Sequence, residues 1–129
     1  MPIGFKIRKK EPDLLLYIFG EGILNMEDLE KFDSFFDKYL KEDNSFKILM
    51  DLRKVENASI GVIKQLVDNR KNYDKYADNK VIATSILIDN YIIESLINML
   101  FSIKQPKRPT KITSDIDEAC NFLNEYQKI

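Results

Sequence analysis

FKILMDLRKVENASIG, residues 46–61, is the stretch that decides the fold. Its first half is an almost continuous apolar run in which Lys47 is the one early charge. A short run of this kind is typical of a strand that is covered on both faces. We therefore expect a central strand over 46–52, a loop over 53–59 and a helix after it. Because ligands and partners gather beyond the carboxyl ends of parallel strands, this loop is the first place to look for function.

The composition is that of an ordinary globular chain. Its 129 residues are 44% hydrophobic and 32% charged, with a net charge of −1, so we expect one domain over 1–129. Such a charge gives no overall field for attracting nucleic acid, and we expect no nucleic-acid partner. The N-terminal stretch MPIGFKIRKK has no apolar core of signal-peptide length, and no window of the sequence reaches the length of a membrane span. The single cysteine cannot form an internal disulfide, and we expect a cytoplasmic protein.

The chain contains no histidine, which removes most catalytic options. Serine or cysteine nucleophiles activated by histidine are excluded, as are histidine proton shuttles and histidine-ligated zinc. With one cysteine, thiolate zinc and iron–sulfur sites are excluded too. We expect no enzyme activity, no catalytic residues, no cofactor and no bound metal.

The hydrophobic pattern alternates between strand and helix periods along the chain. Two short strands precede a helix that Asn25 caps, and the last helix begins after Ser114 as its cap. The pattern predicts an α/β single domain with a four- to five-stranded, mostly parallel mixed sheet covered by about four helices. The expected strands cover 5–9, 14–19, 46–52, 81–88 and 110–113. The expected helices cover 25–41, 60–76 and 91–103, and a last helix follows Ser114.

Two segments carry a family resemblance: KILMDLRKVENASIGVIKQL, residues 47–66, and PTKITSDIDEACNFL, residues 109–123. In their order of elements they resemble STAS domains and their SpoIIAA-like relatives, which share a fold with CRAL-TRIO lipid-binding domains. The resemblance spans nearly the whole chain. It implies a sheet of four or five strands, a regulatory or protein-interaction role, and no catalytic apparatus.

Many STAS domains carry a phosphorylatable serine in an Asp-Ser-Ser/Thr-Gly loop. The matching residues here are Ala58, Ser59, Ile60 and Gly61, so the serine and the glycine are kept while the aspartate and the second hydroxyl are replaced. The resemblance makes Ser59 and Gly61 a candidate phospho-site. The alternative is that Ser59 is a plain helix N-cap.

The predicted helix over 91–103 is more apolar than a helix on a sheet needs to be. A buried stripe of about 100° is enough for such packing, yet the polar residues here form only a narrow stripe. The helix must therefore bury surface against something else: a neighbouring helix, a second copy of the chain, an acyl chain or a bilayer. The candidate contact residues are Tyr91, Ile92, Leu96, Met99, Leu100 and Phe101.

A basic segment follows that helix, with Lys104, Lys107, Arg108 and Lys111 and no acid before Asp115. An apolar helix beside a basic cluster is typical of interfacial binders. Two hypotheses therefore stand. The first is a non-enzymatic interaction domain that binds a protein or itself, as a homodimer, through helix 91–103 and the Ser59 loop. The second is a module that binds an apolar ligand, such as a lipid, or an anionic membrane surface through helix 91–103 and segment 104–111.

Two further patterns are weaker. Gly20 and Gly22 lie between a strand and a helix, as in dinucleotide-binding turns, but the third glycine position holds Asn25. Glu21, Asp51 and Asp89 lie near strand ends, where carboxylates can hold Mg²⁺. We interpret the glycines as a strand-ending turn and the acids as strand-end and loop-edge residues.

Overall fold

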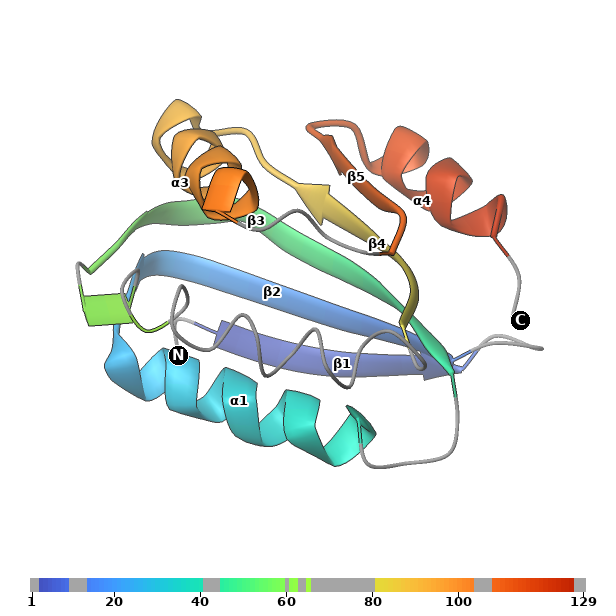
Figure 1. Cartoon of the computed structure of the whole chain (residues 1–129), viewed down its shortest axis with the longest axis horizontal. Coiled ribbons are helices and arrows are strands. Elements are labelled where there is room, and N and C mark those ends of the chain that lie inside the picture. Colours follow the sequence, from blue (N-terminus) through green and yellow to red (C-terminus); the bar gives the residue numbers. More distant parts are fainter. Residues whose placement is uncertain are drawn as a thin grey trace.

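The computed structural model describes residues 3–9, 14–40, 45–59, 61–62, 65, 81–103 and 108–126. Within these ranges the chain forms one twisted sheet with helices packed against it (Figure 1). The predicted helix over 60–76 falls mostly outside them. Its described residues Gly61, Val62 and Gln65 are helical.

The sheet has five strands in the order β1-β2-β3-β4-β5. β1 (Ile3–Lys9) pairs antiparallel with β2 (Leu14–Leu24), as a hairpin. β3 (Phe46–Ala58), β4 (Val81–Leu87) and β5 (Thr110–Thr113) each run parallel to the strand before them. The sequence thus predicted the mixed sheet correctly, and the stretch quoted above supplies its central strand.

Three described helices join or follow the strands: α1 (Met26–Leu40), α3 (Tyr91–Ile103) and α4 (Ile116–Asn124). Asn25 and Asp28 form the predicted capping box. The Asn25 backbone N–H donates to Asp28 Oδ2 at 2.8 Å, and the Asp28 N–H donates to Asn25 Oδ1 at 3.1 Å. This reciprocal pair satisfies two donors that the first turn would otherwise leave free.

α3 and α4 cover opposite faces of the sheet (Figure 1). Ile86 and Ile88 pack in the cluster that includes Ile93 of α3, whereas Leu87 packs with Leu123 of α4. Since successive side chains of a strand point to opposite faces, β4 separates the two helices. This burial on both sides explains why β4 and the first half of β3 are apolar almost throughout.

Two strands run further than the sequence predicted. β2 continues through Gly20 and Gly22 to Leu24, and β3 continues to Ala58, so the predicted loop over 53–59 was wrong for all but its last residue. The extensions pair with each other, with register shifts on either side of Gly22, whose φ is +72°. Glu21, Lys54, Glu56 and Asn57 in these extensions are exposed, which fits their polar local sequence, and the pairing itself stabilises the strands.

The start of α4 also differs from the prediction by one residue. Asp115, and not Ser114, is the N-cap: its carboxylate accepts from the backbone N–H groups of Asp117 and Glu118. The Thr113 hydroxyl accepts from the N–H of Asp115 at 3.2 Å and holds the turn in place. A carboxylate at the N-cap also interacts favourably with the helix dipole, which a serine hydroxyl does to a smaller extent.

Candidate functional site

The carboxyl ends of the parallel strands form one edge of the sheet. α1 and α3 begin where β2 and β4 end, so the starts of these helices lie at the same edge (Figure 1). We call this region, residues 21–26, 53–59, 61–62 and 89–92, the carboxyl edge. In open α/β sheets, this is where ligands and partners bind.

Exposed apolar side chains gather at the carboxyl edge. Ile23 is 60% exposed and Met26 40%, while Tyr91 and Ile92 at the start of α3 are 82% and 51% exposed. Of the large apolar side chains that the structure describes, the other exposed ones are Met99 and Ile116. Single exposed apolar residues are common, but a group of them on one edge indicates a contact surface.

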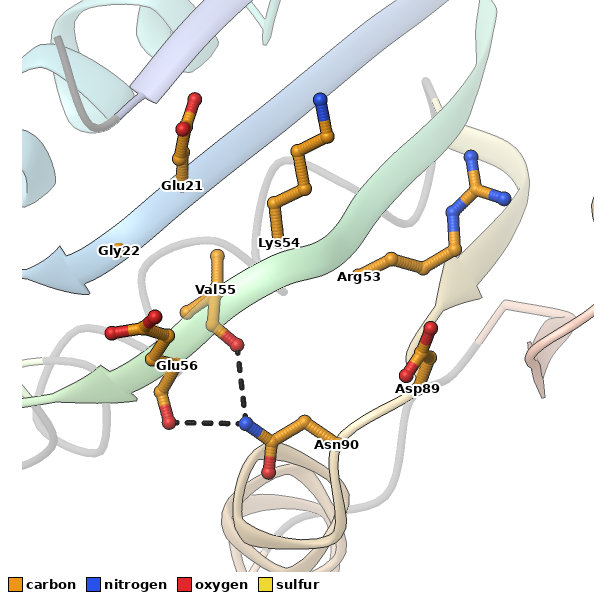
Figure 2. A pocket seen from close by; sticks show the side chains of 8 residues that line it. All are labelled: Glu21, Gly22, Arg53, Lys54, Val55, Glu56, Asp89 and Asn90. Atoms are coloured by element: carbon orange, nitrogen blue, oxygen red, sulfur yellow. Dashed lines mark hydrogen bonds between the residues drawn. The ribbon is translucent and has the colours of Figure 1, made fainter.

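Asn90 fixes the start of α3 against the end of β3. Its side-chain Nδ2 donates to the carbonyl oxygens of Val55 and Glu56 at 3.4 and 3.2 Å, as Figure 2 shows. Its Oδ1 accepts from the backbone N–H of Ile92 at 2.8 Å, which caps the helix. The asparagine therefore holds the exposed first turn of α3 beside β3. The neighbouring strand β2 brings in Ile23, which is the register partner of Asn57.

Ser59 lies within the carboxyl edge and has the predicted capping role. Its hydroxyl accepts from the Val62 N–H at 3.3 Å, and its own N–H donates to the Leu24 carbonyl at 3.1 Å. A Cβ placed on Gly61 would lie 3.7 Å from Met26 Sδ, an ordinary contact distance. The structure thus explains Ser59 as a cap without a phosphate, and its phosphorylation stays a prediction.

An open depression of about 670 Å³ lies at the carboxyl edge (Figure 2). Charged side chains and backbone from β2, β3 and the β4–α3 connection form its walls. The lining residues are Glu21, Gly22, Arg53, Lys54, Val55, Glu56, Asp89 and Asn90.

Arg53 is already engaged by Asp51. The Asp51 carboxylate accepts from Arg53 Nε at 2.9 Å, from Arg53 Nη2 at 2.7 Å and from the Arg53 backbone N–H at 3.1 Å. The Tyr17 hydroxyl donates to the same carboxylate at 3.0 Å. The Arg53 side-chain hydrogen bonds are the largest influence and hold the pKa of Asp51 below its usual value, against partial burial. The guanidinium charge is therefore compensated within the domain.

The predicted contact residues of α3 divide into two groups. Leu96 and Phe101 are half-buried and pack against the core of their own domain, and Leu100 is also half-buried. Tyr91, Ile92 and Met99 are exposed. Much of the apolar surface of α3 is thus buried inside the domain. Its most exposed apolar side chains, Tyr91 and Ile92, lie in the first turn.

The described cations of the basic segment lie away from that first turn. Arg108 Nε donates to the Val81 carbonyl at 2.9 Å, at the amino end of β4. Lys111 Nζ lies 3.1 Å from the Glu118 carboxylate of α4, on the face opposite α3. Lys104 and Lys107 lie outside the described residues. The structure therefore does not bring Arg108 and Lys111 together with Tyr91 and Ile92, and their contact with an anionic surface stays a prediction.

The weaker sequence patterns lead to no site. Gly20 and Gly22 lie inside β2 and not in a strand-to-helix turn, so the dinucleotide pattern does not apply. In the described part of the chain, acidic and cysteine side chains do not form a group of three that could bind a metal ion. None of the described helices combines the length and the apolar character that crossing a bilayer requires.

A family model described as a domain of unknown function, DUF7793, matches residues 28–127. The chain belongs to the DUF7793 family. This DUF7793 chain is similar to the crystal structure of an uncharacterized DUF3478-family protein with a SpoIIAA-like fold from Shewanella loihica PV-4. The TM-score is 0.71 at 16% identity, over 94% of this chain and 93% of that chain. No curated protein matches the chain.

The structural similarity confirms the SpoIIAA-like fold that residues 47–66 and 109–123 predicted. At this identity it shows the fold alone. The sequence did not indicate that Ile23 and Met26 are part of the carboxyl edge. Gly20-Glu21-Gly22 reads locally as a strand-ending turn, and pairing with β3 is what continues β2 to Leu24.

Proposed function

We propose that this DUF7793 domain is a non-enzymatic, regulatory interaction module that binds a protein through its carboxyl edge. The observation that carries the proposal is the exposure of Ile23, Met26, Tyr91 and Ile92 around one edge. Apolar and aromatic side chains of this kind supply most of the binding energy in protein interfaces.

The surroundings of these residues also support binding. Asn90 holds the first turn of α3 through three hydrogen bonds, so Tyr91 and Ile92 stand on a fixed backbone. A side chain on a fixed backbone loses less conformational entropy when it is buried by a partner. The edge is therefore organised before any partner arrives.

Binding to an anionic membrane is less well supported. The described cations of the predicted basic segment, Arg108 and Lys111, have partners within the domain, and both lie away from the exposed start of α3. An interfacial binder needs its cations beside its apolar residues. Sedimentation of the protein with vesicles of anionic phospholipid would favour the membrane hypothesis over a protein partner.

Photo-crosslinking in the native host tests the proposal. A photoreactive phenylalanine analogue replaces Tyr91 in one variant and Ile116 in a matched control. Ile116 is 37% exposed, on the first turn of α4, which packs on the face of the sheet opposite α3. We expect a discrete protein adduct from position 91 and none from position 116, with both variants folded. Equal adducts at the two positions, or none at either, would contradict the proposal.

The role of Ser59 as a regulatory phospho-site is tested separately. A phosphate there would add negative charge at the centre of the carboxyl edge and change its affinity for a partner. The intact mass of the protein from its native host, taken under several growth conditions, reports the modification. A mass that is always that of the unmodified chain would leave Ser59 as an N-cap only.

A further inference from the structure

We infer that the partner of the carboxyl edge presents lysine or arginine side chains around its apolar contact. The inference rests on the function proposed above and specifies the chemistry of the partner. It follows from how the fold distributes charge, which the net charge of −1 does not reveal.

The helices contribute the first part of this charge. Each helix that follows a parallel strand begins at the carboxyl edge of the sheet, and acids are favoured in its first turn by the helix dipole. α1 and α3, which begin within the carboxyl edge, follow this rule. Their exposed first-turn acids are Glu27 in α1 and Glu94 in α3.

The depression contributes the second part. Glu21, Glu56 and Asp89 line it and are exposed, and no described residue forms an ion pair with their carboxylates. Of the two lining cations, Arg53 forms an ion pair with Asp51 and also interacts with Asp89. Arg53 and Lys54 together therefore face four acids, Glu21, Asp51, Glu56 and Asp89. Figure 2 shows the side chains that line the depression. Among the described residues, acids therefore outnumber cations at the carboxyl edge, next to its exposed apolar residues.

This excess of negative charge favours some binding partners of the carboxyl edge over others. A cationic partner is attracted to the edge and associates faster, whereas like charges brought together in an interface cost several kcal/mol. A second copy that docked through the same edge would bring two acidic surfaces together, because an isologous contact uses the same patch of both copies. An anionic lipid surface would be repelled in the same way. The occupant that fits is a different protein with basic side chains around an apolar centre.

The test repeats the photo-crosslinking from position 91 in variants of this chain whose charge is reversed at chosen residues. One variant carries Glu56→Lys and Asp89→Lys. The control carries Glu125→Lys, the same kind of change on an exposed residue at the C-cap of α4, away from the edge. We expect the double variant to lower the crosslinking yield at least about tenfold, and the control to keep it. Raising salt from about 50 to about 300 mM should lower the wild-type yield as well.

The other outcomes separate the two proposals. If the same protein adduct forms with an unchanged or higher yield in the double variant, the cationic partner is wrong and the interaction edge stands. A crosslink to a second copy or to lipid also overturns the inference, and the lipid adduct overturns the protein-binding function too. If position 91 crosslinks to nothing, both proposals fail together.

Discussion

Asp51→Asn perturbs the polar centre of β3 with little change in shape. Asp51 accepts four hydrogen bonds, three from Arg53 and one from Tyr17. Its side chain is 12% exposed, so the interaction differs from a solvated surface ion pair, which contributes about 0–1 kcal/mol. An asparagine keeps one acceptor oxygen and turns the other into a donor. From the charge-assisted bonds that are lost, we expect unfolding to need about 2–3 kcal/mol less free energy.

Tyr17→Phe is the matched control, because it removes one neutral donor from the same carboxylate. We expect it to lower the free energy of unfolding by about 1 kcal/mol. Urea denaturation of the wild type and both variants at pH 7 gives these differences, since a small domain of this kind is expected to unfold in one transition. A loss below about 0.5 kcal/mol for Asp51→Asn would refute the assignment of Asp51 as a partly buried hydrogen-bonding centre.

The pH dependence gives a second check on the same residue. Arg53 lowers the pKa of Asp51 in the folded state, and the unfolded value is about 3.9. A lowered folded pKa stabilises the protein above the unfolded value, and this contribution is lost as the pH falls toward the folded pKa. The stability difference between wild type and Asp51→Asn should therefore be constant from pH 7 to about 5 and shrink below about 4. A difference that does not change in acid contradicts the charge-based account.

Four further substitutions test the fold. Asp115→Ala should destabilise the protein by about 1 kcal/mol and Ser114→Ala by much less, because the carboxylate is the cap; equal effects in thermal unfolding would contradict this. Ser85→Ala should cost about 1–3 kcal/mol in urea unfolding, since the buried hydroxyl donates to the Ala119 carbonyl at 2.8 Å. Gly61→Ala should raise stability by up to about 1 kcal/mol, because the added Cβ meets only ordinary contacts in a helical turn; a loss would point to closer packing there.

The sequence was sufficient for the sheet because burial leaves a direct pattern. The apolar run over 46–52 predicted a strand covered on both faces, and β3 has neighbours on both edges and helices on both faces of the sheet. The capping box at Asn25 was predictable for a similar reason, since both of its partners lie within three residues of each other. Local chemistry and strong periodicity are the features that a single sequence reports well.

The candidate site was harder to predict because it depends on contacts between distant segments. The extension of β3 to Ala58 is stabilised by pairing with β2, more than 30 residues away, and its own sequence reads as a loop. The same pairing makes Ile23 part of the carboxyl edge. Tyr91 and Ile92 were predicted as contact residues from an excess of apolar surface on the whole of α3. The structure shows that both are exposed, and their contact with a partner stays a prediction. The structure reduces the apolar surface of α3 that is left for a partner, because Leu96 and Phe101 pack inside the domain.

A photo-crosslinking scan over the exposed apolar residues tests the central claim most directly. The photoreactive residue is placed in turn at the four positions of the carboxyl edge and at Met99 and Ile116, and the adducts from the native host are compared. The account predicts the same protein adduct from Ile23, Met26, Tyr91 and Ile92, and none from the other two. An adduct that is strongest at Met99 and absent at Ile23 would contradict it and assign the contact to the side of α3.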